Sequence, residues 1–529
     1  MSSALDELGE LNADSLRRNR FCMGVKRDGE YVCGGEADEN VKGKAVELLS
    51  EAIRRMQRWR VWETWWVDEI MDEWLEKRDR LEIQLRGKYG DDVVNDLLRM
   101  VNKFIDYNEK FLNYWHEVGN EVRKLIEDLM SGKAEVIIWE SEKGVSVHGK
   151  FITLEVDRAS NDSVTVQLKL NDLEGVTVKV PNVFKMVMNE EEYKKFKKVL
   201  KLLKGGLEEA DGFIEKGYAS METTQMWQVI VWLLLCFGNK MYVHINSINA
   251  NDYDVTTAWY LQSRCKALKG RILDKVRKLS MEELLAFMLG AILGDGSAGV
   301  FKTAKNGHVY DETVVKITMV DEEFKKWELL LERLKKMGFN WGKPVQTSDD
   351  VIAVRFYGSN AINLARALIN VLPPILRDIL DALGFEKWER TKRIAGMEVK
   401  FRRGEAQISI ANHGFTINVQ KSTVVLVHKV KDDAEVNEVI NALKAMYGDE
   451  FAKHVRVNKS GEYQVVKIPM RIFMRYEDIK RKVIEVLCRK LERTKDEEKR
   501  QIIARQLRRL APTKGAAAAK NYPCAGVSV

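Results

Sequence analysis

The fold of this chain of 529 residues must bury an apolar stretch at residues 284–297 (LLAFMLGAILGDGS). This stretch is apolar on nearly every face for about ten residues, so it cannot lie on the surface, and it is too short to cross a bilayer. Ala286, Gly290 and Gly294 are spaced by four residues and fall on one stripe of a helix. Each interior glycine costs about 1 kcal/mol relative to alanine. Close backbone approach by a second helix would offset that cost.

Asp295 stands at the end of the apolar stretch, where the helix is expected to stop. A carboxylate at the C-terminus of a helix is disfavoured by roughly 0.3–1 kcal/mol, because it faces unpaired carbonyl groups and the negative end of the helix dipole. A cation bound there would reverse the sign of that interaction. Asp295 is therefore a candidate ligand for a cation.

The run from Leu289 to Ser297 resembles the signature helix of the LAGLIDADG homing endonucleases. In that family two such helices pack at a pseudo-two-fold axis, and the acid at each helix end holds a divalent metal over one DNA strand. The resemblance makes Asp295 the catalytic acid and a metal ligand. Leu293 departs from the family pattern, which often has a second Asp there. The residues that the resemblance places at the helix interface are Ala286, Gly290, Gly294 and Gly296.

The residues after the motif follow the family's order of helix, two strands, helix, two strands and helix. Strands are predicted at 297–304 and 313–319, a helix at 321–336, strands at 344–347 and 351–357, and a helix at 361–372. Apolar and polar residues alternate along the second strand of each pair, so one face is buried and the other is polar and partly basic. The residues expected to contact DNA are Lys302, Lys316, Thr318, Arg355 and Tyr357.

Length and periodicity predict an α+β protein of several domains. The predicted segments are a flexible arm (1–40), a Trp-rich helical region (41–131), an α+β domain (132–280), the LAGLIDADG-like αββαββα unit (281–372), a second α+β unit (373–491), a basic helix (492–510) and a disordered tail (511–529). The tryptophans of the helical region are expected in its core rather than stacked on bases. The second unit is interpreted either as a degenerate αββαββα half or as an unrelated domain.

Charge and cysteine usage add weaker constraints. Lysine and arginine (86) exceed aspartate and glutamate (79) by 7, which is compatible with nucleic-acid binding but does not establish it. The basic segments 264–280 and 475–510 either contact phosphates or are solvated helix faces. The six cysteines form no C-x-x-C pair, and no signal peptide or membrane span is visible. We expect reduced thiols in a cytoplasmic protein that does not bind membranes.

The resemblance implies a Mg²⁺-dependent endonuclease of double-stranded DNA, or a catalytically decayed remnant of one. Two metals held by carboxylates would activate water and stabilise charge on the phosphate. No residue of 373–491 matches Asp295, so cleavage of both strands requires a homodimer, or a monomer with pseudo-two-fold halves and a second acid that the sequence does not reveal.

Two other functional classes stay open at the level of sequence. One is a DNA-binding regulator that does not cleave, and the other is an interaction protein that binds no nucleic acid. The layout of the chain is also similar to a crenarchaeal paralogous-repeat family (type 2b) of largely unassigned function. That second resemblance implies an archaeal source.

Overall fold

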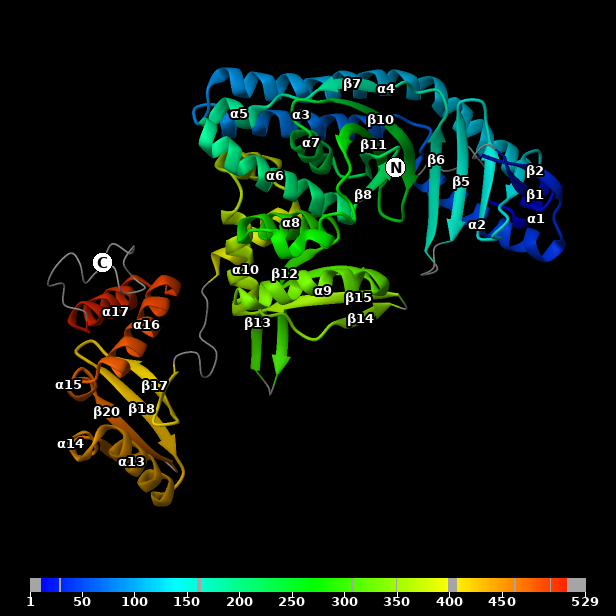
Figure 1. Cartoon of the computed structure of the whole chain (residues 1–529). Helices are drawn as coiled ribbons and strands as arrows, with labels where there is room; N and C mark the ends of the chain where they lie inside the picture. The colour runs from blue at the N-terminus through cyan, green and yellow to red at the C-terminus, as the bar shows by residue number, and fades with distance from the viewer. Residues whose placement is uncertain are drawn as a thin grey trace. The chain divides into compact units, whose positions relative to one another are not determined.

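The computed structural model describes residues 11–27, 30–158, 163–305, 308–348, 350–397, 407–460, 463–494 and 496–510. Helices and strands are mixed throughout the described residues (Figure 1). It divides into two compact units. The first comprises Met1–Gly299, Val315–Arg355 and Ala367–Lys392, and the second comprises Val300–Val314, Phe356–Arg366 and Arg393–Val529.

The first unit begins with the short helix α1 (Ala13–Leu16) and has three long helices before residue 132. These are α2 (Glu39–Trp59), α3 (Trp65–Leu85) and α4 (Asp91–Ser131). The core position expected for the tryptophans holds for Trp66, Trp74 and Trp115, which are fully buried, whereas Trp59, Trp62 and Trp65 are only half-buried. Trp74 of α3 packs edge-on against Trp259, with ring centroids 5.6 Å apart. Helices α3 and α4 therefore cover the strand that carries Trp259, and Figure 1 shows them running along β10 and β11.

A large sheet continues through most of the first unit. Its strands are β1 (Arg20–Arg27), β2 (Glu30–Glu36), β3 (Glu135–Ile138), β4 (Gly144–His148), β5 (Ile152–Arg158), β6 (Val164–Leu170), β7 (Val176–Lys179), β8 (Gly212–Glu215), β9 (Tyr218–Thr223), β10 (Lys240–Ala250) and β11 (Val255–Lys266). Their order is β2-β1-β3-β4-β5-β6-β10-β11-β9-β8, and β7 also pairs with β10. The strands before and after residue 180 thus form one hydrogen-bonded surface.

The expected flexible arm at residues 1–40 is corrected for the part that the structure describes. Strand β1 pairs in parallel with β3, and the side chains of Phe21 and Cys22 are buried against the rest of the unit. The structure also joins Cys22 to Cys33 of β2 as a disulfide, in place of the two reduced thiols that the sequence suggested. Strands β1 and β2 are short and rich in glycine and charged residues, so the sequence shows little of the apolar alternation that predicts a strand.

Helices alternate with the later strands of the first unit. They are α5 (Val183–Val187), α6 (Glu190–Ala210), α7 (Met226–Leu235) and the 3₁₀-helix η2 (Leu273–Lys278). Helix α6 begins with a capping box, in which the side chain of Asn189 accepts from the amide of Glu192 and Glu192 accepts in return. The apolar stretch at its predicted place is α8 (Met281–Gly294), which has a second capping box between Ser280 and Glu283.

After α8 the chain forms β12 (Ser297–Lys305), β13 (His308–Val320), α9 (Asp321–Lys336), β14 (Val345–Ser348), β15 (Val351–Tyr357) and α10 (Ser359–Asn370). The four strands form a sheet in the order β12-β13-β15-β14. Trp327, Leu330, Leu331 and Leu334 recur at helical spacing on α9 and are buried. One face of α9 is therefore held against a core and the other is solvated.

The remaining elements are α11 (Pro374–Leu383), α12 (Glu386–Gly396), β16 (Gln407–Ile410), β17 (His413–Val419), β18 (Val424–Val430), α13 (Asp433–Tyr447), α14 (Asp449–Lys453), β19 (Arg456–Ser460), β20 (Tyr463–Pro469), α15 (Met470–Phe473), α16 (Glu477–Arg493) and α17 (Glu497–Leu510). The strands form a sheet in the order β16-β17-β18-β20-β19. A core that includes Phe415, Leu426 and Leu487 joins this sheet to its helices. The expected disordered tail, 511–529, lies outside the described residues.

One arrangement of two hairpins occurs three times. In the sets β8–β11, β12–β15 and β17–β20, the second strand of the first hairpin pairs with the second strand of the second hairpin. The strands of the expected second unit, 373–491, thus repeat the order found in the two earlier sets. The helix that packs along α8 is α6, which lies outside 373–491.

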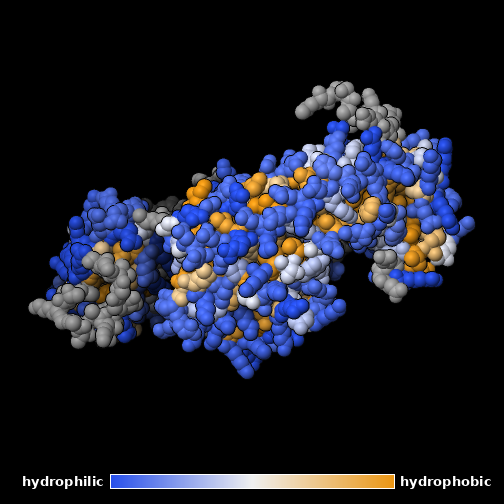
Figure 2. All heavy atoms as spheres, turned by 90° about the horizontal axis from the view of Figure 1, so that it is seen from above, coloured by the Kyte–Doolittle hydropathy of each residue, from blue (hydrophilic) through white to orange (hydrophobic). Residues whose placement is uncertain are grey.

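No helix in the described part of the chain is both long and apolar enough to span a membrane. The face drawn in Figure 2 carries mostly hydrophilic residues, with hydrophobic residues in small groups between them.

Helix α8 packs along α6, and the contact is made by backbone. A Cβ at Gly206 of α6 would overlap the carbonyl oxygen of Phe287, and a Cβ at Gly290 of α8 would overlap the carbonyl oxygen of Leu203. Each hypothetical Cβ would lie 3.0 Å from the Cα of the opposite glycine. The two glycines therefore face one another, which accounts for the glycine cost noted in the sequence of α8.

Replacing Gly206 and Gly290 together by alanine is expected to destabilise the protein, because rigid backbone atoms occupy the space that each Cβ needs and overpacking costs about 1–3 kcal/mol at each site. The higher helix propensity of alanine, about 1 kcal/mol per site, offsets part of this loss. The midpoint of denaturant-induced unfolding measures the net effect.

Gly43, inside α2, provides the matched control, because a Cβ there would meet no atom within 4 Å. G43A is expected to raise the same midpoint by up to about 1 kcal/mol of stability. A double variant of Gly206 and Gly290 that matched G43A in stability would contradict the close packing of α6 on α8.

Candidate active site

Two aspartates end the two paired helices. Residues 206–212 have the sequence GLEEADG and residues 290–296 have GAILGDG, so an aspartate and a glycine follow each contact glycine at the same spacing. Asp211 is the C-cap of α6, with φ −98° and ψ −8°. Asp295 is the C-cap of α8, with φ −82° and ψ −6°. The packing of α6 on α8 thus brings the two aspartates to the same end of the helix pair.

The glycines around these acids leave room for the carboxylates. A Cβ at Gly212 or at Gly296 would collide with the last turn of the preceding helix. The glycine after each aspartate therefore allows the backbone to turn tightly there. A Cβ at Gly294 would lie 2.8 Å from Oδ2 of Asp211. The carboxylate of Asp211 therefore reaches across to the end of α8.

Burial and mutual repulsion set the charge of this acid pair. Burial raises the pKa of Asp295 to about 6, and the neighbouring charge of Asp211 adds to the rise. Burial also raises the pKa of Asp211, against the opposing effects of Lys387 and of a hydrogen bond from Gln228. Two carboxylates that repel one another in this way form a site that a cation stabilises.

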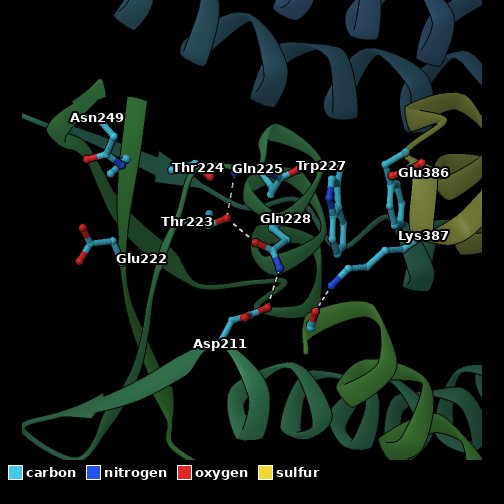
Figure 3. A pocket seen from close by; sticks show the side chains of 13 residues that line it. Asp211, Glu222, Thr223, Thr224, Gln225, Trp227, Gln228, Asn249, Glu386 and Lys387 are labelled. Carbon is cyan, nitrogen blue, oxygen red and sulfur yellow. Dashed lines mark hydrogen bonds between the residues drawn. The ribbon is translucent and has the colours of Figure 1, made fainter. Parts of the chain in front are cut away.

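Side chains from neighbouring elements hold Asp211 in place (Figure 3). Nε2 of Gln228, on α7, donates to Oδ2 of Asp211 at 2.6 Å. The hydroxyl of Thr223 donates to Oε1 of Gln228 and accepts from the backbone amide of Gln225 at 2.9 Å. These hydrogen bonds use Oδ2 of Asp211 as the acceptor. They do not involve Oδ1.

Two ammonium groups lie on the ends of the paired helices. Lys387, on α12, donates from Nζ to the carbonyl oxygens of Leu293, at 3.1 Å, and of Gly294 (Figure 3). Lys269, which follows β11, donates from Nζ to the carbonyl oxygen of Gly212 at 2.8 Å. Burial lowers the pKa of Lys387 while the two aspartates oppose that change. Each helix end therefore carries both a carboxylate and a nearby cation.

Asp211 borders a cavity of about 560 Å³, which Gly294, the residue before Asp295, also lines. The side chains of Trp227 and Phe385 stack in its wall, with ring centroids 3.9 Å apart and planes inclined by 4°. The other residues that line it include Asp211, Glu222, Thr223, Gln225, Gln228, Asn249, Gly294 and Lys387. Figure 3 shows polar side chains, among them Glu222 and Asn249, on the strand side of the cavity, and Trp227 together with Glu386 and Lys387 on the opposite side.

The donor set fits Mg²⁺ that is shared with a substrate phosphate. Mg²⁺ prefers oxygen ligands and is often bound by one or two carboxylates together with phosphates and water. Asp211 and Asp295 provide two such carboxylates. No group of three or more His, Cys, Asp or Glu side chains in the described ranges is placed to hold a metal ion. A phosphate would therefore have to complete the coordination.

The structure places the other predicted site residues at different distances from this pair. Thr318, on β13, donates its hydroxyl to the carbonyl oxygen of Asp295 at 2.8 Å. Lys316 is half-buried on the same strand, and its carbonyl oxygen lies 2.9 Å from where a Cβ of Gly296 would stand. The remaining three are an exposed Lys302 on β12 and a half-buried Arg355 and Tyr357 on β15. Contact of these residues with DNA stays a prediction.

Ala286, the other residue predicted at the helix interface, is fully buried in α8. It lies one turn before Gly290, on the stripe that the spacing of small residues predicted. With Gly290 against Gly206 and Gly294 against Asp211, the stripe continues to the end of the helix.

Asp211 was not among the residues predicted from the sequence, which left 373–491 open as either a degenerate second half or an unrelated domain. The helix that pairs with α8 is α6, which precedes it in the chain. The signal was the heptapeptide at 206–212, which has the spacing of the motif but is interrupted by charge. Lys204 and Glu208 are both buried and pair with one another inside the helix, so their charges do not keep α6 at the surface.

No family model matches this chain, and no curated protein matches it. Parts of the chain are similar to solved LAGLIDADG enzymes. These include the I-SmaMI LAGLIDADG homing endonuclease bound to cleaved DNA (13% identity, 41% of this chain and 93% of that chain, TM-score 0.13), LAGLIDADG meganuclease I-AabMI bound to uncleaved DNA (11%, 42% and 96%, 0.14) and the I-LtrWI LAGLIDADG homing endonuclease bound to target DNA (15%, 42% and 97%, 0.14). Identities and TM-scores this low do not support a functional argument, so the proposed function is argued from the geometry of the site.

The raised pKa of Asp295 predicts that this residue lowers the stability of the protein at neutral pH. Between about pH 4 and pH 6 the folded chain binds more protons than the unfolded chain, so stability falls as the pH rises through this range. D295N removes the charge and is expected to raise the melting temperature near pH 7.5. The difference from the native protein should vanish near pH 4.

Asp274, exposed in η2, gives a matched control, since D274N also removes one carboxylate from the same unit. Its melting temperature should differ little from that of the native chain. A D295N variant that melts below the native protein near pH 7.5 would contradict the strained acid pair.

Proposed function

We propose that residues 190–370 form two LAGLIDADG-like halves, the first αββαββ with the 3₁₀-helix η2 after it and the second αββαββα, and that the protein is a magnesium-dependent DNA endonuclease. The first half runs from α6 through β8–β11, and the second runs from α8 through β12–β15 to α10. The observation that carries the proposal is the pair of aspartates, Asp211 and Asp295, at equivalent ends of two helices in glycine contact. Such a pair supplies one acid for each of two DNA strands.

Both acids lie in one chain, so the proposal needs no second copy of the protein. A monomer with pseudo-two-fold halves replaces the homodimer as the working arrangement. The strands that follow each acid, β8–β11 and β12–β15, would supply the surfaces that contact the duplex. Lys316, Thr318 and Arg355 are the groove or phosphate contacts proposed on the second of these sheets.

The side chains of the site have separate roles in this proposal. Bound Mg²⁺ would supply a more acidic water molecule and positive charge at the scissile phosphate. Asp211 and Asp295 would hold that metal, with Gln228 orienting the carboxylate of Asp211. Lys269 and Lys387 provide ammonium groups next to the acids, where they would offset the charge that develops on the phosphate.

A second candidate function is DNA binding without cleavage. Lys387 favours it, because its ammonium group already occupies the carbonyl oxygens of Leu293 and Gly294 at the end of α8. An internal cation at this place stabilises the helix end and reduces what a metal ion would gain there. Metal binding to Asp295 would then require Lys387 to move aside.

The test has two steps because the target sequence of the protein is not fixed by its structure. A randomised DNA duplex library is first selected for binding to the native chain, and the selected duplexes are then incubated with the protein and Mg²⁺. The native chain is expected to cut both strands, and the double variant of D211N and D295N is expected to lose cleavage by about 100-fold or more. D274N serves as the control and should cut like the native chain.

Binding and cutting are scored separately. The double variant should retain salt-dependent binding, because the removed acids are not the phosphate-contacting groups. If the native chain binds the selected duplexes but never cuts them, the endonuclease proposal fails and DNA binding without cleavage takes its place. Failure to enrich any duplex would contradict both candidates.

A further inference from the structure

A second cavity lies away from the acid pair, along the same helix. It has a volume of about 990 Å³ and is lined by α6, the end of α7, the end of β11 and the segment around η2. Lys201, on its wall, precedes Asp211 by ten residues, which corresponds to about 15 Å along the helix axis. The cavity is therefore separate from the candidate active site.

Basic side chains from three elements gather around this cavity. Six of them are exposed and form no ion pair with a carboxylate in the described part of the chain: Lys198, Lys201, Arg264, Lys266, Arg271 and Lys275. Lys197 also lines the cavity, with its ammonium group 5.9 Å from the ring centroid of Tyr193. Glu283 is the one carboxylate among the described lining residues, and it accepts from the backbone amide of Ser280.

An ordinary solvated helix face does not account for this arrangement. At the start of α6, Lys194 and Lys195 have acidic partners in Glu190 and Glu282. Lys197, Lys198 and Lys201, further along α6, have no acidic partner in the described residues, and they line the cavity together with the arginines and lysines of the end of β11 and the segment after it. Seven cations around one hollow repel one another, and a multivalent anion would remove that repulsion.

We propose that this cavity binds a small ligand that carries two or more linked phosphate groups. Lysine and arginine are the side chains that bind phosphate oxygens, and Arg264 and Arg271 can do so through two hydrogen bonds each. The volume of the cavity falls in the range of small-molecule sites. Phe237 and Tyr193 add aromatic surface to the same wall, on which a nucleoside base could pack.

Cys265 provides a reporter inside this cavity. It is half-buried in the cavity wall, and the neighbouring Cys236 is buried. A hydrogen bond with Cys236 lowers the pKa of Cys265 to about 7, and Lys204 adds to the effect. The thiolate of Cys265 is therefore available to a neutral alkylating reagent near neutral pH, and a ligand in the cavity should shield it.

The experiment titrates the native full-length chain with ATP and with tripolyphosphate, without added metal, in about 0.15 M salt. Calorimetry is expected to show saturable binding of one ligand per chain. Alkylation of Cys265 by iodoacetamide, followed by mass spectrometry, should slow in parallel with saturation. Tighter binding of ATP than of tripolyphosphate assigns a nucleotide as the source of the phosphates, and equal binding assigns the phosphate chain alone.

Charge reversal tests whether these side chains form the site. The double variant of K201E and R271E is expected to lower the affinity by about tenfold or more. K103E is the matched control, because Lys103 is exposed on α4 in the same unit and does not line the cavity. The double variant of D211N and D295N should bind the ligand like the native chain, so loss of DNA cleavage does not affect this result.

Three results would overturn the proposal. These are no saturable binding of either ligand, equal affinity of the native chain and the variant of Lys201 and Arg271, and protection of Cys265 by a single-stranded oligonucleotide but by neither small ligand. The last result would assign the cavity to a nucleic-acid strand instead.

Discussion

The contact between Gly206 and Gly290 positions everything else in the centre of the first unit. Because neither residue has a side chain, the backbones of α6 and α8 approach until their Cα atoms set the separation. Each helix then ends five residues later in an aspartate, so the contact fixes where Asp211 and Asp295 stand. The hairpins that follow the two acids start from the same point. A larger residue at either glycine would separate the helices and the acids together.

Placing two carboxylates at the C-terminal ends of two helices is electrostatically unfavourable, and the surroundings reduce that cost in two ways. A hydrogen bond from Gln228 holds the carboxylate of Asp211, and the ammonium groups of Lys269 and Lys387 lie on the nearby carbonyl oxygens. The pKa of Asp295 nevertheless remains at about 6. This residual strain is what a bound cation would relieve, and it links the stability of the protein to its proposed chemistry.

The elements of the second proposed half were predicted well from the sequence because their signals are local. The helix predicted at 321–336 is α9 with the same bounds, and α8 is the buried, glycine-striped helix that its composition required. Strand β13 begins at His308, five residues before the predicted start, because a polar strand end has no alternating pattern to mark it. Asp295 and Thr318 were found from these local signals and lie together at the site.

The first half was not predicted because its evidence is tertiary. Buried Lys204 and Glu208 interrupt the apolar run of α6, and their pairing is visible only once the helix is folded. Lys387 lies 92 residues after Asp295, so no spacing rule could assign it to the end of α8. The strand order of β17–β20 repeats the order of β8–β11 and of β12–β15. This repetition explains why the sequence of 373–491 resembled a degenerate second half.

Cross-linking of α6 to α8 tests the pairing of the two acids most directly. Ala210 and Gly294 directly precede Asp211 and Asp295, and a Cβ at Gly294 would overlap the Cβ of Ala210, so a small separation of the helix ends brings two cysteines there to disulfide distance. The chain carrying A210C and G294C should form a disulfide on mild oxidation, seen as one linked peptide by mass spectrometry, whereas neither single variant should form that peptide. Absence of the linked peptide in oxidised, folded protein would contradict a site shared by Asp211 and Asp295.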